Sequence, residues 1–265
     1  MLEIKNVTKI FNLTGNVEDK KVALDNVSLK VNDGDFITII GGNGSGKSTL
    51  MNLIAGVFLP DSGNIILDGE ELTKLSEHKR AKYLGRVFQD PKQGTAANMS
   101  MLENLEIAYR RGERQRLVWG FKQEHKKIFE SELAKFDLGL ENRLEQKVGM
   151  MSGGQRQALT LLMATIKKPK LLLLDEHTAA LDPKTADKVL MFTDKIVKEN
   201  NLTTLMITHN MKDALTYGNR LVMLNEGKII LDVAKEEKDK LTVEDLLARF
   251  KASKDIVLDD KMILG

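Results

Sequence analysis

Asp35–Thr49 reads DFITIIGGNGSGKST, and this stretch decides the fold that the sequence predicts. Its first part, Asp35–Ile40, is a short run rich in β-branched residues that leads straight into a glycine-rich loop. Residues 46–56 then place leucine and isoleucine side chains on one face and end at Gly56, which is typical of an amphipathic helix. A strand, a glycine-rich loop and a helix in this order are the context in which a phosphate-binding loop forms.

The loop Gly41–Ser48 satisfies the pattern G-x-x-x-x-G-K-[ST]. Glycines let the backbone curl so that several N–H groups point at one phosphate chain, and the start of the following helix adds its positive dipole end. Lys47 is expected to reach the β- and γ-phosphates, and the Ser48 hydroxyl to bind Mg²⁺. The alternative, a glycine-rich turn without a ligand, does not account for the strand, the Lys-Ser pair and the helix together. The residues predicted to bind nucleotide here are Gly41, Asn43, Gly44, Ser45, Gly46, Lys47, Ser48 and Thr49.

The composition of the 265-residue chain excludes several other classes of protein. Lys and Arg number 40 and Asp and Glu 38, so the net charge of +2 indicates no broad nucleic-acid surface. The absence of cysteine excludes disulfide scaffolds, iron–sulfur sites and thiol catalysis, and four histidines do not suggest a His-rich metal centre. No signal-peptide core and no apolar run of about 20 residues is present, so we expect a soluble chain that is not exported.

Strands alternate with helices along the chain, which predicts an α/β fold with a parallel central sheet. Residues 1–40 read as strands interrupted by a polar insertion at 12–21. Residues 90–150 are mostly helical in pattern and include the basic stretch 110–127, with seven Lys or Arg and two Glu. The further predicted elements are strands and a helix in 63–88, a helix at 154–167, strands at 170–174 and 203–208, a hairpin at 221–231, and a helix after a capping box at Thr242 and Asp245.

Lys170–Glu176 reads KLLLLDE and predicts a buried strand with acidic residues at its carboxyl end. If this strand neighbours the one that precedes the phosphate loop, Asp175 can hold Mg²⁺, usually through water. Glu176 follows at once and can polarise an attacking water molecule. Taken alone, an apolar strand that ends in acidic residues is equally compatible with an ordinary surface strand end.

Met151–Gln155 reads MSGGQ, with Ser152 lying 23 residues before Asp175 at the start of a predicted helix. A serine, two glycines and the free N–H groups of a helix start form a second anion site. The pentapeptide resembles the LSGGQ signature of the ATP-binding-cassette (ABC) ATPases, and the resemblance extends over about residues 1–235. It implies a P-loop NTPase fold with a RecA-like core, an antiparallel β subdomain and a helical subdomain inserted at about 90–165, followed by a C-terminal helix and tail at 236–265.

The resemblance also implies roles for residues outside these motifs. Phe11, in VTKIF, matches the aromatic position that stacks on adenine, although a bare Phe there would be interpreted as core. Gln89, in RVFQ, matches the glutamine that contacts Mg²⁺ and water and senses the membrane partner. Asp182 matches a residue that contacts the opposite subunit, and His209 the switch histidine at the γ-phosphate; without the family, both would be interpreted as structural.

Two positions depart from the family pattern. Met151 replaces the usual leucine of the signature, and both side chains fill an apolar position. His177 replaces the proline that commonly follows the catalytic glutamate, which is expected to change local backbone freedom. Asp175 and Glu176 are intact, so the resemblance implies an active ATPase.

The resemblance implies a dimer, because the signature of one cassette closes over the ATP held by the other. The signature residues expected to contact that ATP are Ser152, Gly153, Gly154 and Gln155. Two chains, or two paired cassettes, then sandwich two ATP molecules. Hydrolysis is expected to use Glu176 as the base and Lys47 and His209 to stabilise charge. The expected Mg²⁺ ligands are Ser48, Asp175 and Gln89.

No membrane span is fused to the chain, which resembles the separate ATPase subunits of bacterial transporters, importers above all. Within that group, the chain resembles the ATPase component of tryptophan/tyrosine uptake systems. The features that carry this resemblance are the sequence DEHTAALDP, the insertion after Phe11 and the Arg-rich stretch. The implied partners are a membrane permease and an extracytoplasmic lipoprotein, with the chain at the cytoplasmic face of the membrane and no nucleic acid. The basic stretch 110–127 either faces lipid or the permease, or is a solvated helix face with Trp119 in a local core.

Three alternatives remain at this point. One is the ATPase subunit of an exporter. Another is a soluble ABC ATPase that acts on the ribosome or DNA. The presence of a single cassette disfavours a ribosomal role. The 128 residues from Lys47 to Asp175 lack the sustained heptads of a coiled coil, which disfavours a role on DNA. The last is a P-loop kinase or GTPase, which would not need the residues 152–155.

Overall fold

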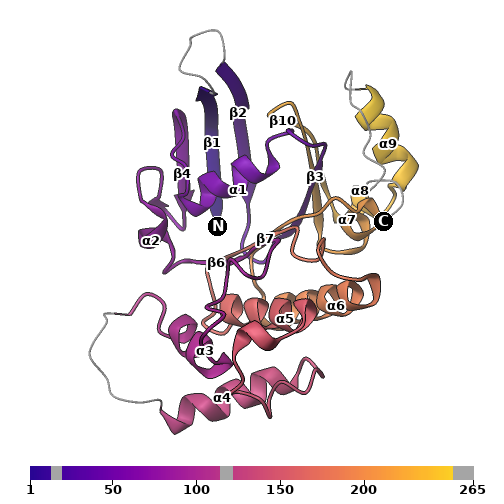
Figure 1. Ribbon diagram of the computed structural model, residues 1–265. Helices are drawn as coiled ribbons and strands as arrows, with labels where there is room; N and C mark the ends of the chain where they lie inside the picture. Colours follow the sequence, from indigo (N-terminus) through magenta and orange to yellow (C-terminus); the bar gives the residue numbers. More distant parts are fainter. Residues whose placement is uncertain (13–19, 114–121, 253–265) are drawn as a thin grey trace. The chain divides into compact units, whose positions relative to one another are not determined.

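The computed structural model describes residues 1–12, 20–113 and 122–252, and Figure 1 shows its elements in order. The chain divides into two compact units. Unit 1 comprises Met1–Arg80 and Thr203–Gly265, and unit 2 comprises Ala81–Leu202. Of the predicted features, the polar insertion at 12–21 and the basic stretch at 110–127 lie partly outside the described residues, and Trp119 lies wholly outside them.

An antiparallel sheet in unit 1 has the order β2-β1-β4-β5, with β1 at Leu2–Asn12, β2 at Lys20–Val31, β4 at Ser62–Leu67 and β5 at Glu70–Glu71. Apolar residues alternate with polar ones along β1, and Leu2 and Ile4 are buried opposite Val31 and Leu29 of β2. This alternation places one face of the sheet in the core and the other in solvent.

A second sheet in unit 1 centres on β3, Phe36–Gly41, whose six residues are all buried. β3 pairs in parallel with β8, Thr204–Ile207, on one side and with β9, Arg220–Asn225, on the other; β9 pairs antiparallel with β10, Lys228–Ala234. A strand buried on both faces is expected in a parallel sheet, and it explains why 36–40 is apolar except for Thr38, whose hydroxyl donates to the Ala214 carbonyl at 2.9 Å.

The helices of unit 1 are α1 (Lys47–Ala55), α2 (Glu77–Arg80), α7 (Met211–Thr216), α8 (Lys235–Lys238) and α9 (Val243–Ala252). Leu246 and Phe250 of α9 are fully buried against Met211 and Ala214 of α7. The C-terminal helix is therefore part of the unit 1 core. Its start has the predicted capping box, with Asp245 N–H donating to Thr242 Oγ1 (3.2 Å) and Thr242 N–H to Asp245 Oδ2 (2.9 Å).

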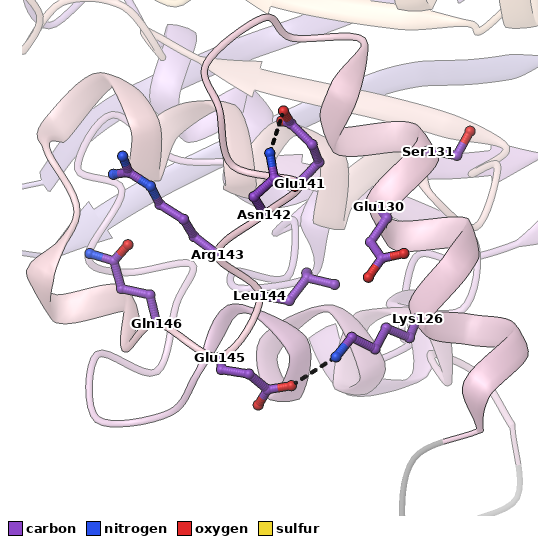
Figure 2. A pocket seen from close by; sticks show the side chains of 9 residues that line it. All are labelled: Lys126, Glu130, Ser131, Glu141, Asn142, Arg143, Leu144, Glu145 and Gln146. Atoms are coloured by element: carbon purple, nitrogen blue, oxygen red, sulfur yellow. Dashed lines mark hydrogen bonds and ion pairs between the residues drawn. The ribbon is translucent and has the colours of Figure 1, made fainter.

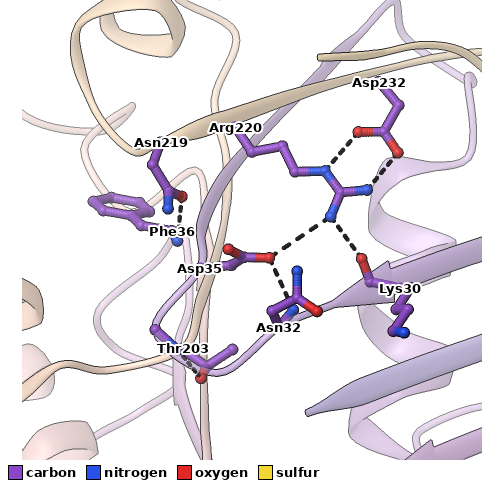
Figure 3. A network of polar contacts seen from close by, with 9 residues as sticks. Lys30, Asn32, Asp35, Phe36, Thr203, Asn219, Arg220 and Asp232 are labelled. Carbon is purple, nitrogen blue, oxygen red and sulfur yellow. Dashed lines mark hydrogen bonds and ion pairs between the residues drawn. The ribbon is translucent and has the colours of Figure 1, made fainter. Parts of the chain in front are cut away.

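A polar network holds the start of β3 in place (Figure 3). Arg220 donates from Nε and Nη2 to the two carboxylate oxygens of Asp232 (2.6 and 2.5 Å) and from Nη1 to the Lys30 carbonyl (2.6 Å). The Phe36 N–H donates to Asn219 Oδ1 at 2.8 Å. Bonding to Asp232 raises the pKa of Arg220, so this bidentate pair links β9, β10 and the end of β2.

Unit 2 contains the parallel pair β6 (Leu84–Val87) and β7 (Leu171–Asp175), in which Val87 lies opposite Leu174. Its helices are α3 (Met101–Tyr109), α4 (Gln123–Ala134), the 3₁₀ turn η2 (Val148–Met150), α5 (Gly153–Thr165) and α6 (Pro183–Asn200). No described helix of either unit is long and apolar enough to cross a membrane. The predicted α/β fold with parallel pairing and an antiparallel β sheet is confirmed.

Candidate functional site

The glycine-rich loop joins β3 to α1 within unit 1, as the sequence predicts. Gly46, the N-cap of α1, has φ +103° and makes no side-chain capping hydrogen bond. A methyl group on Gly46 would lie 2.6 Å from the Ala23 carbonyl oxygen, so only glycine fits there. Because no capping side chain occupies the N–H groups at the start of α1, they are suited to an anion.

Lys47 is 5% exposed, and its ammonium is folded back over the loop. Nζ donates to the carbonyl oxygens of Gly41 (2.7 Å) and Gly42 (3.0 Å). The Ser45 hydroxyl in the same loop is buried and has no hydrogen-bond partner among the described residues. A buried cation and an unsatisfied hydroxyl within one cradle fit the phosphate chain of a nucleotide.

The turn between β9 and β10 is bonded to the loop Gly41–Ser48 through a backbone hydrogen bond. Gly227 N–H donates to the Ser45 carbonyl at 3.0 Å, and the Gly227 carbonyl accepts from Asp25 N–H of β2 at 2.9 Å. A methyl group on Gly227 would lie 2.9 Å from the Ala23 carbonyl oxygen, and Gly227 has φ +76°. The close approach of this turn to Ala23 explains why glycine stands at 227, in the turn of the predicted hairpin.

His209 follows β8, at the edge of the sheet where β3 enters the loop. The parallel pairing sets Ile207 opposite Ile39, and the Thr208 N–H donates to the Ile39 carbonyl at 3.2 Å. Asn210 then caps α7, accepting from the N–H groups of Lys212 (2.8 Å) and Asp213 (3.2 Å). Parallel strands bring their carboxyl ends to one edge, so His209 and the phosphate loop share that edge of the sheet.

Phe11 lies near the end of β1 and is partly exposed. Its ring meets the Phe58 ring edge-on, with the centroids 5.2 Å apart and the planes at 76°. Its cross-strand partner is Lys21 of β2. Phe11 is therefore not a core residue, which was the alternative interpretation of the sequence, and it is not fully exposed to solvent. Its partly exposed ring leaves surface for a planar ligand.

In unit 2, Asp175 ends β7 and is partly exposed, with its Oδ2 3.5 Å from Nη2 of Arg86 on β6. Gln89 follows β6 by two residues and is exposed. Because β6 and β7 are parallel, Gln89 and Asp175 emerge at the same edge of the pair.

Glu176 has a left-handed backbone conformation with φ +48°, which is uncommon for a residue with a side chain. Its carbonyl accepts from the Ala179 N–H at 3.0 Å, closing a turn directly after β7. Strained backbone of this kind is found preferentially where function requires a fixed geometry. The sequence pattern that singled out Glu176 contains no sign of this conformation.

His177, the departure from the family proline, is 2% exposed and its Nε2 lies 3.1 Å from Thr193 Oγ1 on α6. Burial lowers the pKa of His177 to about 4, so the imidazole is neutral at physiological pH. The structure adds to the expected change in backbone freedom a buried hydrogen bond from the turn after β7 to α6. No sequence signal connects residues 177 and 193.

Ser152 is the N-cap of α5 and forms a capping box with Gln155. The Gln155 N–H donates to Ser152 Oγ (3.3 Å), and the Ser152 N–H donates to Gln155 Oε1 (3.2 Å). The pattern S-x-x-Q at a helix start is the signal that could have predicted this capping role. Both side chains are thus held in place before any partner approaches.

The two signature glycines have different surroundings. A methyl group on Gly154 would lie 2.2 Å from Thr185 Cγ2, whereas one on Gly153 would meet only Leu181 Cδ2, at 3.6 Å. Asp182, the N-cap of α6, accepts from the Thr185 N–H at 3.1 Å. Hydrogen bonding from the Thr185 side chain, and then from this N–H, lowers the pKa of Asp182. Gly154 therefore serves the packing of α5 on α6, and Asp182 serves as a helix cap within its own chain.

Two pockets in unit 2 differ in their charge. One, of about 220 Å³, is lined by Ser152, Gly154 and Gln155 together with Lys184 and Lys188, so positive charge gathers beside the signature. The other, of about 470 Å³, lies beside α4 and the segment 141–146 (Figure 2). Its lining combines the carboxylates of Glu130, Glu141 and Glu145 with Lys126 and Arg143, and Lys126 pairs with Glu145 at 3.2 Å. It contains none of the predicted site residues.

The predicted site residues therefore form two sets. Unit 1 contains Phe11, His209 and the loop 41–49, whereas unit 2 contains Gln89, Asp175, Glu176, Asp182 and residues 152–155. Among the described residues, no cluster of three or more His, Asp or Glu forms a ready-made metal site. Isolated hydroxyl, carboxylate and amide oxygens fit Mg²⁺, which keeps several waters and binds substrate phosphates instead of filling a protein cage.

Comparisons with known proteins connect the site to a family. A family model described as ABC transporter matches residues 24–179. The chain is 48% identical over 251 residues to a tyrosine transport ATP-binding protein of Clostridioides difficile, covering 94% of this chain and 98% of that protein. It is 33% identical over 235 residues to a methionine import ATP-binding protein of Haemophilus influenzae, covering 87% of this chain and 64% of that protein.

Solved structures have the same fold. A dimeric ATP-binding cassette bound to ADP and phosphate, MJ0796, superposes with a TM-score of 0.76 at 29% identity, covering 89% of this chain and 99% of that one.

Proposed function

Because the chain belongs to the family of ABC transporter ATP-binding proteins, we propose that it is the ATP-hydrolysing motor subunit of an importer. The observation that carries this proposal is the phosphate loop of unit 1. It combines glycines whose conformations no other residue adopts easily, an uncapped helix start and the buried ammonium of Lys47. These features together suit the phosphate chain of a nucleoside triphosphate.

ATP is the proposed substrate, and each set of site residues has a part in its hydrolysis. Lys47 exchanges the carbonyls of Gly41 and Gly42 for phosphate oxygens, and His209 adds a donor at the same sheet edge. Glu176 accepts a proton from the attacking water. Ser48, Asp175 and Gln89 would hold Mg²⁺, which would neutralise charge along the phosphate chain.

A second copy of the chain, or a paired cassette, completes the site. The chain has one phosphate loop and one signature, and both are suited to anions. The α5 start, with Lys184 and Lys188 nearby, faces a pocket with no acidic residue in its lining. We propose that this surface closes over the ATP bound to the other cassette and that Asp182 lies at that contact. The dimeric solved structure that the chain resembles supports this arrangement.

The proposed cargo is an amino acid with an aromatic side chain. The supporting observation is the 48% identity to a tyrosine transport ATP-binding protein over nearly the whole of both chains. The chain itself contacts no cargo in this scheme. It works at the cytoplasmic face of the membrane with an integral permease and an extracytoplasmic lipoprotein that binds the amino acid.

Hydrolysis is tested with the purified chain, Mg²⁺-ATP and the Glu176→Gln variant. We expect the ATPase rate to fall at least a hundredfold while ATP binding remains and a nucleotide-dependent dimer accumulates. The matched control is Glu199→Gln, an exposed glutamate on α6, which should keep the wild-type rate. Equal rates for wild type and Glu176→Gln would remove Glu176 from the mechanism, and a wild-type chain that binds no ATP would refute the proposal.

The transport role is tested by purifying the tagged chain from its native membranes in mild detergent and identifying the proteins that accompany it. Recovery of a multi-span protein and a lipoprotein supports the importer, and the ligand bound to that lipoprotein identifies the cargo. A multi-span protein without a lipoprotein supports an exporter instead. Recovery of ribosomes or DNA-associated proteins without a membrane subunit would contradict the transporter assignment.

A further inference from the structure

Lys21 of β2 lies between two parts of the candidate nucleotide site. Along the chain it is 20 residues from the phosphate loop and shares no motif with it. In the β1–β2 pair, however, Lys21 is the direct cross-strand partner of Phe11. Directly opposed residues of an antiparallel pair project to the same face, so Lys21 and the proposed adenine-stacking ring share one side of the sheet.

The Lys21 ammonium also reaches the tip of the phosphate loop. A methyl group in place of a Gly44 hydrogen would lie 3.9 Å from Lys21 Nζ, and it would have no other neighbour within 4 Å. Gly44 is exposed and has φ +79°. Among the described residues, Lys21 is therefore the neighbour that the Gly44 side of the loop tip faces.

Among the described residues, none places a negative charge on Lys21; Glu18 and Asp19 of the preceding segment lie outside them. Within the described part of the chain, no carboxylate lies within ion-pairing distance of Lys21; Asp25 on the same strand pairs with Lys228 at 3.1 Å. The other cation at this loop is Lys47, whose ammonium is already buried under the backbone of Gly41 and Gly42. Two positive charges held near one loop repel each other, and an anion between them relieves the repulsion.

We propose that Lys21 is a further nucleotide-binding residue, whose ammonium contacts the phosphate chain from the outer side of the loop Gly41–Ser48. This inference rests on the proposed ATP-binding function and adds a contact to it. A nucleotide with its base on Phe11 and its phosphates at the loop has to pass Lys21, which lies beside both. The partner is the phosphate chain because a lysine ammonium gains most from a charged oxygen.

Removal of the Lys21 charge is expected to weaken nucleotide affinity and to leave the rate of the hydrolysis step unchanged. Lys21 is exposed and touches no reacting group, so its removal should weaken ground-state and transition-state binding equally. We expect Lys21→Gln to weaken ATP and ADP binding about tenfold at low salt, as for the loss of one charge-assisted hydrogen bond. The difference from wild type should shrink at high salt, because exposed charges are screened.

The experiment is equilibrium titration of the full-length chain with ATP, ADP and adenosine, without divalent metal so that no hydrolysis intervenes. The matched control is Lys20→Gln, the neighbouring exposed lysine, whose side chain leaves β2 on the opposite face and whose partner is Asn12. Lys20→Gln should bind ATP and ADP within about twofold of wild type. Lys21→Arg should retain most of the affinity, because it keeps the charge.

Two affinity results for the lysine variants would overturn the inference, and a third result with adenosine would do the same. One is an ATP affinity of Lys21→Gln within about twofold of wild type; the other is an equal loss in Lys21→Gln and Lys20→Gln, which would show general loss of surface charge. An equal loss for adenosine and ATP would also contradict it, because adenosine has no phosphate. The variant Lys47→Ala separates this result from the proposed function: if it abolishes ATP binding while Lys21→Gln does not change it, ATP binding stands and the Lys21 contact does not.

Discussion

The Nε2 atom of His177 lies 3.1 Å from Oγ1 of Thr193, and both residues are buried. The Thr193 hydroxyl donates its hydrogen to the Val189 carbonyl at 2.8 Å, so it accepts from His177, and the imidazole carries its proton on Nε2. This chain of two hydrogen bonds links the residue after Glu176 to the middle of α6. The turn that contains the candidate base is thereby held to a long helix.

Replacing Thr193 by valine tests this connection. Valine has the same shape but no oxygen, so it leaves the buried Nε2–H of His177 without an acceptor. We expect the free energy of unfolding to fall by about 1–3 kcal/mol, the cost of an unsatisfied buried donor. The measurement is urea denaturation followed by circular dichroism.

The matched control for Thr193→Val is Thr165→Val at the end of α5. The Thr165 hydroxyl also bonds a carbonyl of its own helix, that of Leu161 at 2.8 Å, but no side chain of the described residues donates to it. Thr165→Val should therefore cost less than about 0.5 kcal/mol. If the two variants are equally stable, the His177–Thr193 bond contributes nothing to stability.

Stability should depend on pH through His177. Burial lowers the pKa of His177 to about 4 in the folded protein, whereas histidine in the unfolded chain has an ordinary pKa of ~6.5. Between these two pH values, His177 binds a proton in the unfolded state but not in the folded state. The stabilisation is complete above pH ~6.5 and decreases as the pH falls towards 4, by at most about 1.4 kcal/mol per pH unit.

The test compares urea unfolding of wild type and His177→Gln at pH 7, 6 and 5, without nucleotide or divalent metal. Glutamine can still donate to Thr193 but does not titrate. Its unfolding free energy should therefore fall less steeply with acidification than that of wild type. Parallel pH profiles for the two proteins would mean that the His177 imidazole titrates normally in the folded state.

The two signature glycines should respond differently to alanine. Gly154→Ala places a methyl group 2.2 Å from Thr185 Cγ2, and the β-branched Thr185 has little freedom to turn away in its helix. We expect Gly154→Ala to lose about 1–3 kcal/mol of unfolding free energy and Gly153→Ala to lose almost none. Thermal melting of both variants gives the comparison.

A second substitution shows whether this specific clash is responsible. Thr185→Ser removes the methyl group that Gly154→Ala would strike and keeps the hydroxyl. The double variant should regain most of the stability lost by Gly154→Ala alone. No recovery would indicate that Gly154 is required for its backbone conformation and not for the packing of α5 on α6.

Arg80 should stabilise the helix that follows the phosphate loop. It is fully buried, and it donates to the carbonyls of Leu53 (2.6 Å) and Ile54 (2.9 Å) in the last turn of α1. Burial lowers the pKa of Arg80 to about 10, which still leaves the guanidinium charged at neutral pH. A cation at this end of a helix is favoured by the helix dipole.

Arg80→Met should destabilise the protein by about 3 kcal/mol or more, because several buried carbonyls lose their donor at once. Lys79→Gln, at the neighbouring exposed position, should change stability by less than about 0.5 kcal/mol. Chemical denaturation of the two variants side by side is the measurement. Equal stabilities would show that water replaces the guanidinium at the end of α1 without cost.

Much of the fold could be predicted because its strongest signals are local. Helix α1 was expected at 46–56 and runs over 47–55, since Gly46 and Gly56 both have left-handed conformations that stop a helix. The strand expected at 170–174 is β7, and the hairpin expected at 221–231 is β9 with β10. In each case neighbouring residues set the backbone conformation, so a short window of sequence was sufficient.

The candidate site was predictable in its motifs but not in its contacts. The sequence identified Ser152 and Gln155 as a second anion site, yet their side chains cap α5. It assigned Glu176 from its place after a buried strand but gave no sign of its left-handed backbone. A motif specifies which residues are available, whereas their hydrogen-bond partners depend on the elements packed around them.

The sequence by itself determined the phosphate loop, the α/β alternation and the family, because these follow from residue types at short, regular spacing. Only the tertiary structure decided that His177 bonds Thr193, that Lys21 stands between Phe11 and Gly44, and that Arg80 caps α1. These residues are separated by 10 to 27 positions and meet through strand register and helix packing. Such contacts depend on how whole elements come together, and that is a property of the folded chain.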